Sequence, residues 1–564
     1  MIYSFISIGT NIGDRIYNIK KAIDFISQKN QIIDISSLYI TKPMYYLNQP
    51  YFINCAIKIK TSLSPYNLLN FILEIENKMG RKRSFKNSPR IIDLDLIYYG
   101  DLIIKSKKLF IPHPKLYERA FVLIPLSDID KNFLDPLKNK KIGDLVKNLS
   151  FNNDEILKIP SNFKETLNFI SKIPPRNAND FNTKYIKKTI KLLGTSQNDC
   201  GKVIHITGSC GKTATAFYIA KLIQRLGYNV CIYTSPHIMD IRERIIFNGK
   251  KIPKKIFYKK IIKVISVAQY LHSSFEYMTL IAIDWFSELK PDFSIIEVGM
   301  GGKNDATNIF EKSISVFTSI TLEHSNWLGK NIEEIAKNKS GIIKSGSFVF
   351  ISGFNEKKVI EVIKNIADAK KCVTYIFNRK NLIENSKTNS FKNINLSYAF
   401  FIVKKLLNKL PSSFIIPQLP ARQKVLSYNG IKFFFDGAHT TLSMKILLEY
   451  LKKLDYRICL ASFLKDKSHK DIINLILESG IFDKVILVKG TSQRTFNPYD
   501  YRGISNVKIF SNQLNALNFA LSFKKNIVVT GSLYFCADIL ALINGKKPLH
   551  LLELAIDPQK LIAN

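Results

Sequence analysis

The sequence has little cysteine, little arginine and no long apolar run. Its seven cysteines are odd in number, scattered along the chain, and never paired at a spacing typical of metal ligands. This pattern predicts reduced thiols in a cytoplasmic protein rather than a disulfide-stabilised secreted one. No uncharged apolar stretch approaches the roughly 18 to 20 residues that cross a bilayer, which argues against a membrane protein. The apolar residues 1–10 lack a basic leader and are followed by Asp14 and Arg15, so they predict a strand rather than a signal peptide.

The chain is strongly basic, and most of its basic residues are lysine. Its formal charge is +38, with 69 Lys against 14 Arg. Such a charge invites a nucleic-acid interpretation. Lysines spread over solvated faces account for the charge better, so a basic scaffold that binds nucleic acid is kept only as an alternative. Eight of the 14 arginines lie in the motif segments described below: Arg15, Arg81, Arg83, Arg90, Arg119, Arg242, Arg244 and Arg422. Because the planar guanidinium grips phosphate or carboxylate in a way that Lys cannot copy, this concentration indicates binding sites.

Length and local patterns predict three domains. A chain of 564 residues exceeds what one hydrophobic core normally supports. Short apolar strands alternate with helical patterns in the first part, which is typical of a compact α+β domain. From Val203 a strand, a glycine-rich turn and a long helix follow one another, as in a parallel sheet. A smaller open α/β pattern begins near Pro411, and residues 378–395 read as a surface insertion. The predicted boundaries are 1–155, a polar linker at 156–164, 165–408 and 409–564.

Two aspartates two positions apart mark the first candidate site. Asp93 and Asp95 lie on a predicted strand, so both side chains leave the same face. Two carboxylates on one face can hold Mg²⁺ against a triphosphate, although a polar edge strand shows the same pattern. Nearby segments supply cations for phosphates and flat faces for an aromatic substrate: Arg81, Arg83, Arg90, His113, Arg119, Phe52 and Phe121.

These residues closely resemble the 6-hydroxymethyl-7,8-dihydropterin pyrophosphokinase family. The resemblance spans residues 1–155 in several separate motifs: Ile8–Arg15, Thr41–Pro43, Asn54, Glu76, Gly80–Arg83, Pro89–Asp95, His113–Pro114 and Arg119–Leu126. It implies a ferredoxin-like α+β domain that moves the terminal diphosphate of ATP to a pterin hydroxymethyl group and releases AMP. By this resemblance Asp93 and Asp95 hold Mg²⁺, while Arg81, Arg90, His113 and Arg119 steady the phosphates. The residues implied to frame the pterin are Thr41, Pro43, Met44, Phe52, Asn54 and Phe121.

Two departures from the family pattern bear on activity. Phe52 stands where a Tyr is common, which loses a hydroxyl but keeps the ring. Asn87 stands where some members carry a Trp on the closing loop, which predicts slower closure. A chain in which only the second site is active therefore stays an alternative.

The second candidate site is a phosphate-binding loop between a strand and a helix. Thr207-Gly208-Ser209-Cys210-Gly211-Lys212-Thr213 follows the apolar strand Val203–Ile206. Backbone N–H groups of such a loop cradle phosphates, Lys212 reaches the outer phosphates and Thr213 can meet Mg²⁺. The spacing differs from the common P-loop, because Ile206 occupies the first glycine position. Taken alone, such a loop could also be an incidental turn between a strand and a helix.

Further motifs follow in order, and together they resemble the folylpolyglutamate synthase and dihydrofolate synthase family of the Mur-ligase type. They are Tyr233–His237, Arg242–Arg244, Phe275–Glu276, Glu297–Gly302, Asp305–Asn308, His324, Trp327–Gly329, Lys339–Gly341, Arg422, Asp436–His439 and Gly531–Tyr534. The resemblance implies a central P-loop α/β domain and a smaller Rossmann-like α/β domain. The implied chemistry is amide formation: ATP phosphorylates a carboxylate, and the amine of glutamate displaces phosphate from the acyl phosphate.

The same resemblance implies a role for each site residue. Thr207, Gly208, Ser209, Gly211, Lys212 and Thr213 would bind ATP, with Arg422, Asp436 and His439 reaching it from the last domain. Ser235, Glu297 and His324 would be Mg²⁺ ligands, and Lys339 would carry a carbamate that holds a second Mg²⁺. Cys210, Glu323 and Thr440 replace the more usual Asn, Asp and Asn, which indicates a divergent member.

The sequence therefore predicts a bifunctional, cytoplasmic enzyme of folate biosynthesis. Its substrates would be ATP, the pterin, dihydropteroate and L-glutamate, with Mg²⁺ at both sites and no nucleic-acid or membrane partner. The intervening condensation with p-aminobenzoate would fall to a separate dihydropteroate synthase, since no third catalytic set is visible. Extension of polyglutamate tails stays open.

Overall fold

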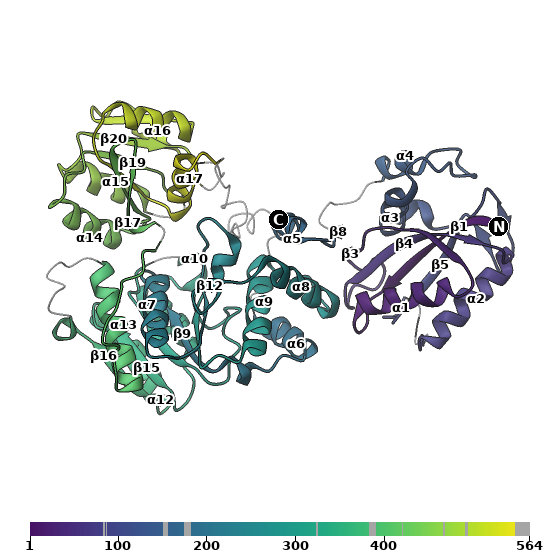
Figure 1. Ribbon diagram of the computed structural model, residues 1–564, viewed down its shortest axis with the longest axis horizontal. Coiled ribbons are helices and arrows are strands. Elements are labelled where there is room, and N and C mark those ends of the chain that lie inside the picture. Colours follow the sequence, from purple (N-terminus) through teal and green to yellow (C-terminus); the bar gives the residue numbers. More distant parts are fainter. Residues whose placement is uncertain are drawn as a thin grey trace. The chain divides into compact units, whose positions relative to one another are not determined.

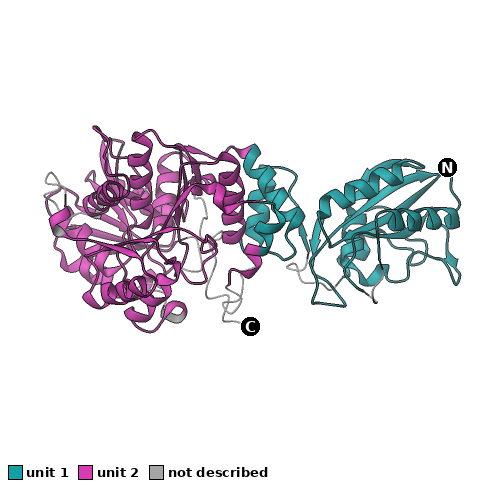
Figure 2. Cartoon of the chain, turned by 90° about the horizontal axis from the view of Figure 1, so that it is seen from below, with its two compact units in different colours: residues 1–174, 188–194, 255–273 teal, residues 175–187, 195–254, 274–564 magenta. Residues whose placement is uncertain are grey.

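The computed structural model (Figure 1) describes residues 1–82, 85, 87–149, 156–173, 182–322, 325–382, 391–419, 421–465, 468–490 and 495–546. The chain divides into two compact units (Figure 2). Unit 1 contains residues 1–174, 188–194 and 255–273. Unit 2 contains residues 175–187, 195–254 and 274–564. Each unit is described by itself below.

Unit 1 is built on an antiparallel sheet. Among its described residues the strand order is β5-β1-β4-β3-β8, with β2 also paired to β4. The strands are β1 Ile2–Thr10, β2 Gln31–Ile35, β3 Tyr39–Thr41, β4 Phe52–Thr61, β5 Asp93–Tyr99 and β8 Ile156–Lys158. A small ribbon pairs β6 Ile104–Lys105 with β7 Phe110–Ile111. The long central strands β1 and β4 are mostly buried because helices cover the sheet on each side.

The helices of unit 1 begin where the sequence supplies caps. Asp14 accepts a hydrogen bond from the N–H of Tyr17, and Ser64 caps the helix that starts at Pro65. The helices are α1 Arg15–Ser27, α2 Pro65–Lys78, α3 Ala120–Asp130, α4 Ile142–Lys147, α5 Phe163–Lys172 and the 3₁₀ helix η1 Leu116–Glu118. In Figure 1, α1 and α2 lie on one side of the sheet and α3 and α4 on the other.

The first sheet of unit 2 is mostly parallel, with the order β12-β11-β10-β13-β9-β14-β15-β16 in the described part of the chain. From β10 to β16 every pairing is parallel, so the carboxyl ends of these strands meet at one edge. The strands are β9 Lys202–Thr207, β10 Val230–Tyr233, β11 Ile245–Phe247, β12 Lys250–Lys251, β13 Phe293–Glu297, β14 Ile314–Phe317, β15 Phe348–Ser352 and β16 Val373–Phe377.

The second sheet of unit 2 has the order β17-β18-β22-β19-β20-β21 over its described residues. Only the β17–β18 pair is antiparallel. The strands are β17 Arg422–Tyr428, β18 Ile431–Asp436, β19 Ile458–Ala461, β20 Lys484–Val488, β21 Val507–Phe510 and β22 Ile527–Thr530. Their buried Val, Ile, Leu and Phe side chains form cores on both faces of this sheet.

Helices cover the two sheets of unit 2. Helices α7 and α13 pack against β9, β13 and β15 in one apolar core, and α11 and α12 pack against β14 and β15 in another. The helices are α7 Lys212–Arg225, α9 Ser274–Leu289, α10 Ser325–Leu328, α11 Ile332–Lys339, α12 Lys357–Ala369, α13 Phe391–Leu407, α14 Thr441–Leu451, α15 His469–Glu478, α16 Gln513–Ser522 and α17 Leu533–Ile543. Helices α6 Lys184–Leu192 and α8 Lys254–Val267 each divide between the units. The 3₁₀ helices are η4 Gln197–Cys200, η5 Ile241–Arg244, η6 Ser340–Ile342, η7 Arg379–Asn381 and η8 Pro498–Tyr501.

The predicted order of one α+β domain followed by two α/β domains is confirmed. The segment 156–164 differs from the expected linker, because it contains β8 and the start of α5. Strand β8 is only three residues long, and its pairing with β3 is what makes it a strand. The expected insertion at 378–395 lies partly outside the described residues. For its last residues the prediction is wrong, because residues 391–395 begin α13 and Asn395 is buried. The other predicted boundaries stay predictions.

No helix in the described residues is both long enough and apolar enough to cross a membrane. All seven cysteines lie in the described residues, and none of them forms a disulfide.

Candidate functional sites

A cavity of ≈ 560 Å³ in unit 1 lies beside the carboxyl-terminal part of α2 and the start of β5. The predicted metal and phosphate residues of the first site all line it: Arg81, Arg90, Asp93, Asp95, His113 and Arg119. Arg83 lies outside the described residues. Leucines and Phe110 supply the apolar part of the wall. The wall of the cavity therefore combines charged and apolar side chains.

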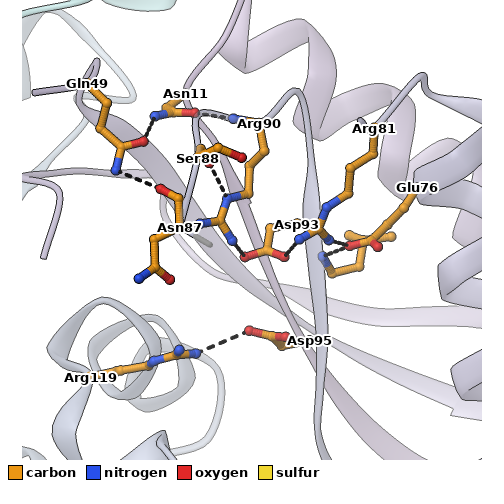
Figure 3. Close-up of polar contacts among 11 residues, drawn as sticks. Asn11, Gln49, Glu76, Arg81, Asn87, Ser88, Arg90, Asp93, Asp95 and Arg119 are labelled. Carbon is orange, nitrogen blue, oxygen red and sulfur yellow. Dashed lines mark hydrogen bonds and ion pairs between the residues drawn. The ribbon is translucent and has the colours of Figure 1, made fainter. Parts of the chain in front are cut away.

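Asp93 is held by two arginines (Figure 3). Its Oδ1 lies 2.7 Å from Arg81 Nη2, and its Oδ2 accepts from Arg90 Nη1 at 2.6 Å. Both arginine side chains are mostly buried, at 12% and 19% exposure, so the pairs are screened only weakly by water. Charge-assisted bonds of this length orient both partners. Asp93 is thus presented to the cavity in one orientation.

Asp95 leaves the same face of β5 and pairs with a different arginine. Its Oδ2 accepts from Arg119 Nη1 at 3.3 Å. Burial and the neighbouring Asp93 charge raise the pKa of Asp95 to about 6, while Arg119 opposes the shift. Two carboxylates that repel each other in a partly buried site favour a divalent cation between them and phosphate oxygens.

Glu76 belongs to this network, although the sequence analysis gave it no role. It lies on α2 with only 2% of its surface exposed. Its Oε1 accepts from the Leu94 N–H at 2.7 Å and from Arg81 Nη1. Burial raises the pKa of Glu76, and Arg81 opposes that shift. Glu76 therefore orients Arg81. In the sequence, only the place of Glu76 in the family motif indicates such a role.

His113 follows β7 and lines the cavity. Burial and the nearby Arg119 lower the pKa of His113 to about 4. The imidazole is therefore neutral at neutral pH, and it differs in this respect from the phosphate-binding cation that the sequence analysis expects. A neutral imidazole still offers one N–H donor.

The residues predicted to frame the pterin lie around β3 and β4. Thr41 and Asn54 are buried and joined by a hydrogen bond of 2.6 Å from Asn54 Nδ2 to Thr41 Oγ1. Gly9 on β1 makes room for Asn54, because a Cβ at Gly9 would lie 2.7 Å from Asn54 Oδ1. The remaining members are Pro43, Phe52, Phe121 and Met44, of which Met44 is 49% exposed.

Two of these aromatic rings contact the arginines of the phosphate side. The Arg90 guanidinium lies 5.6 Å from the Phe52 ring centroid, and that of Arg119 lies 5.6 Å from the Phe121 centroid. Such cation–π contacts contribute about 0.5–1 kcal/mol each at partly exposed positions. Because Phe52 keeps the ring, the loss of the usual hydroxyl leaves this contact intact.

In unit 2 the phosphate loop lies between β9 and α7, as predicted. Gly211 caps α7 in the left-handed conformation, at φ +84°. Gly208 lies against Thr318, whose Oγ1 would be 2.0 Å from a Cβ at that position. Lys212 Nζ donates to the Gly208 carbonyl at 2.8 Å. The N–H groups of Ser209 and Cys210 donate to the Ser319 carbonyl at 2.7 and 3.2 Å. The loop leads directly into the N-terminus of a long helix and carries one lysine beside it, which is a geometry that binds phosphate.

Glu297, at the end of β13, is the central carboxylate of the second site. It is 1% exposed, and it accepts from Thr213 Oγ1 at 3.0 Å and from the Ser235 N–H at 3.2 Å. Burial raises the pKa of Glu297, while the charges of Lys212 and Arg422 oppose the shift. The structure thus brings Thr213, Ser235 and Glu297 together. His324, the other predicted ligand, lies outside the described residues.

Lys339 ends helix α11 and is 2% exposed. Its Nζ donates at 3.0 Å to the same Gly208 carbonyl that Lys212 contacts. Burial of a lysine is costly unless its charge is compensated. The structure therefore places Lys339 at the phosphate loop rather than on the surface.

Arg422 connects the last sheet to the phosphate loop within unit 2. Its Nη2 donates to Thr213 Oγ1 at 3.0 Å, and it is opposite Asp436 in the β17–β18 pair. Burial raises the pKa of Asp436 to about 6, and its Oδ1 accepts from the Ala438 N–H at 3.0 Å. His439 hydrogen-bonds the Gly437 carbonyl through Nδ1 at 2.8 Å.

Cys210 Sγ lies 3.6 Å from Thr440 Oγ1, so two of the three residues that depart from the family pattern in this half of the chain are in contact.

Asp305 supports this site, and sequence reasoning gave it no role beyond its motif. The buried carboxylate accepts from the N–H groups of Met300 and Thr307, both at 2.9 Å. Thr307 Oγ1 in turn lies 2.8 Å from His205 Nε2 on β9. The network therefore ties the glycine-rich turn after Glu297 to the strand that precedes the phosphate loop.

The described residues contain no group of three or more His, Cys, Asp or Glu side chains that could hold a metal ion.

Comparison with protein-family models gives two matches. Residues 5–131 match the model of 7,8-dihydro-6-hydroxymethylpterin-pyrophosphokinase, and residues 206–408 match the Mur ligase middle domain. The resemblances inferred from the sequence are confirmed by these matches and by the relatives that follow.

Three curated relatives match different parts of the chain. The 2-amino-4-hydroxy-6-hydroxymethyldihydropteridine pyrophosphokinase of Aquifex aeolicus is 41% identical over 138 residues, which are 24% of this chain and 86% of that protein. The dihydrofolate synthetase of Saccharomyces cerevisiae is 26% identical over 417 residues, covering 64% of this chain and 97% of that protein. The folic acid synthesis protein FOL1 of Dictyostelium discoideum is 39% identical over 194 residues, but the match covers only 27% of its length.

Among solved structures, the folylpolyglutamate synthase of Mycobacterium tuberculosis complexed with ADP aligns with a TM-score of 0.61. The alignment covers 68% of this chain and 99% of that one at 22% sequence identity. It shows a shared fold.

Proposed function

Because the chain belongs, through residues 5–131, to the 7,8-dihydro-6-hydroxymethylpterin-pyrophosphokinase family and carries a Mur ligase middle domain at residues 206–408, we propose that it catalyses two ATP-dependent steps of folate biosynthesis. The first step is diphosphorylation of 6-hydroxymethyl-7,8-dihydropterin with release of AMP. The second is ligation of L-glutamate to dihydropteroate with release of ADP and phosphate. The same ligase site would also extend folate polyglutamate tails.

The arginine-bound aspartate pair is the observation that supports the first step. In this reaction the pterin hydroxyl oxygen bonds to the β-phosphorus of ATP, the bond from that phosphorus to the α-phosphate oxygen breaks, and the hydroxyl proton is released. Negative charge develops on the phosphates, and fixed cations stabilise it. Arg81, Arg90 and Arg119 line one cavity, and each lies next to a carboxylate that keeps it oriented.

The cluster around Glu297 supports the second step. A substrate carboxylate takes the γ-phosphoryl group of ATP, and the amine of glutamate then displaces phosphate and forms the amide. Lys212 reaches the Gly208 carbonyl of the phosphate loop, so a cation lies where a nucleotide phosphate would bind, and Lys339 contacts the same carbonyl. Arg422 adds a second cation next to Thr213.

The residues present fit Mg²⁺ at both sites. Magnesium is usually held by one or two carboxylates together with substrate phosphates, and it would neutralise phosphate charge when bound. Asp93 and Asp95 are such a pair, and mutual repulsion already disfavours their joint ionisation. In the second site Thr213, Ser235 and Glu297 supply hard oxygen ligands, which His324 and a carbamylated Lys339 would complete.

The alternatives raised by the sequence are less well supported. The ring of Phe52 keeps its contact with Arg90, and the backbone carbonyl of Asn87 accepts a hydrogen bond from Gln49 in the first site, which supports an intact first site despite the two departures. A nucleic-acid scaffold does not explain the relatives in both halves of the chain. The diphosphate product would go to a separate dihydropteroate synthase, which would displace diphosphate with an arylamine.

The nucleotide product made with each substrate tests the proposal. Purified full-length protein with ATP and Mg²⁺ should form AMP with hydroxymethyldihydropterin, and ADP with dihydropteroate and glutamate. Chromatography of the nucleotides separates the two reactions in one preparation. Absence of AMP would contradict the first activity, and absence of ADP would contradict the second.

A further inference from the structure

Gln49 joins three segments of unit 1 beside the first site (Figure 3). It lies just before β4, in the segment 42–51, which contains the pterin-side residues Pro43 and Met44 and is followed directly by Phe52. Its side chain is 6% exposed. Gln49 Nε2 donates to the carbonyl of Tyr46 at 2.8 Å and to that of Asn87 at 3.3 Å. Its Oε1 accepts from Asn11 Nδ2 at 3.0 Å.

Asn11 extends this hydrogen-bond network to Arg90. It follows β1 directly and is 1% exposed. Its Oδ1 accepts from the Arg90 N–H at 2.7 Å, and its own N–H donates to the Arg90 carbonyl at 3.1 Å. Its Nδ2 also donates to the Pro50 carbonyl at 3.1 Å. Asn11 thus holds both sides of the Arg90 backbone and two residues of the segment 42–51.

Arg90 connects this hydrogen-bond network to the carboxylate of Asp93. Its guanidinium donates to Asp93 at 2.6 Å and to the Ser88 carbonyl at 3.3 Å, and it lies over the Phe52 ring. Phe52 directly follows the segment that Gln49 fixes. The backbone and the guanidinium of Arg90 are therefore both tied to elements on the pterin side.

We propose that Gln49 is a positioning residue that, through Asn11, couples the pterin-side segment 42–51 to Arg90 and so makes pterin binding and nucleotide binding cooperative. This inference depends on the proposed first activity. On the proposed first activity the pterin would contact one end of the network and the nucleotide the other, and whatever orders one end reduces the ordering cost at the other. Because such coupling is reciprocal, each ligand raises the affinity for the other by the same factor.

A purely structural role would give a different result. If Gln49 only stabilised the fold, its loss would lower the melting temperature and leave the binding of the two ligands as interdependent as before. If it positions Arg90, its loss reduces the interdependence and kcat, while the affinity for each ligand alone changes little. The distinguishing quantity is therefore the ratio of two affinities.

The test uses the full-length chain and the variant Gln49→Met, which keeps the side-chain length but removes every hydrogen bond of the amide. The affinity for hydroxymethyldihydropterin is measured by calorimetry with and without α,β-methylene-ATP and Mg²⁺, an analogue that cannot release AMP. In the parent protein the nucleotide analogue should raise pterin affinity, and in Gln49→Met that ratio should fall toward one. The kcat for AMP formation should fall on the order of tenfold to a hundredfold, because misplacing one charged group by a fraction of an ångström costs that much.

Two further variants complete the test. Gln31→Met, at an exposed position on β2, should match the parent protein in coupling and kcat. Gln49→Glu keeps the acceptor for Asn11 and loses the two donors, so its coupling ratio should lie between those of the parent protein and Gln49→Met. If Gln49→Met fails to fold, Gln49→Glu provides the test in its place. Parent protein that forms no AMP would refute the proposed first activity. Parent protein that forms AMP, with the coupling ratio and kcat unchanged in the Gln49 variants, would refute the positioning role alone.

Discussion

The two candidate sites are built from different chemical groups. In the first, charge lies on side chains that are already paired: Asp93 with Arg81 and Arg90, and Asp95 with Arg119. In the second, a glycine-rich loop supplies backbone groups, and the buried carboxylate Glu297 has neutral hydrogen-bond partners, Thr213 and the Ser235 amide.

This difference has a physical consequence. A ligand of the first site must exchange existing ion pairs for new ones, so it reorganises a network that is already oriented. In the second site, Lys212 Nζ and Lys339 Nζ both donate to the Gly208 carbonyl. Because Lys212 belongs to the phosphate loop itself, we expect its loss to have the largest effect on the second reaction.

Lys212→Ala should produce the largest and most selective effect. We expect ADP formation with dihydropteroate and glutamate to fall on the order of 10³-fold, because Lys212 is the lysine of the phosphate loop. AMP formation with the pterin should stay near normal, because Lys212 has no part in the first site. Both products are measured in one preparation. If the single change also stops AMP formation in folded protein, the two sites are coupled and the comparison between independent sites breaks down.

Asp95→Asn should affect only the other reaction. We expect AMP formation to fall about 10²- to 10³-fold, since one charge of the Mg²⁺-binding pair is lost where phosphate charge builds up. The exposed Asp101→Asn on the same domain serves as the matched control and should keep full AMP output.

Protein stability provides a check that the Asp95 variant is folded. The folded-state pKa of Asp95 is raised from 3.8 to about 6, so the stability it contributes is present below about pH 4 and is lost as pH rises through about 6. Removing this charge should therefore leave the metal-free melting temperature at pH 8 unchanged or higher. A folded Asp95→Asn protein with normal AMP output would refute the metal-binding role.

Lys339→Ala should lower ligase activity on the order of 10²-fold, because it removes a buried side chain at the phosphate loop, whether that side chain acts as a cation or as a carbamate. If Lys339 carries a carbamate, a short carboxylate added to the buffer should partly restore ADP formation. Lys337→Ala, at an exposed position on the same helix, should behave like the parent protein. Full ligase activity in Lys339→Ala would overturn the assignment, whereas absence of rescue would argue only against the carbamate.

The Mg²⁺ requirement for AMP formation should show the smallest and most gradual change. Protons compete with Mg²⁺ for Asp95, whose pKa is about 6. The Mg²⁺ concentration that supports half-maximal AMP formation should be nearly constant from pH 8 to pH 7, and it should rise about tenfold for each pH unit below about 6. A steady-state titration with Mg²⁺ at several pH values measures this. A flat dependence down to pH 5 would show that Asp95 does not bind the ion.

Local patterns were enough to predict several features of both sites. The two-residue period of a strand puts Asp93 and Asp95 on one face whatever the rest of the fold does, and both lie on β5 as expected. An apolar strand followed by glycines and a helix likewise predicted the loop between β9 and α7. The roles of the individual residues stay predictions.

The network around these residues was decided by tertiary structure. Asn11, Gln49 and Asn87 are distant in sequence, and only the packing of three loops against β1 and β5 brings their polar groups within hydrogen-bond distance. The neutral state of His113 also depends on burial, which no local pattern reports. Strand β8 was missed for a similar reason, because a three-residue strand exists only through its partner β3. The sequence alone determined which chemical groups are available and the order of the domains, since both follow from residue types and short periods. Which carboxylate faces which arginine was determined by the fold, because those distances depend on how segments far apart in the chain pack together.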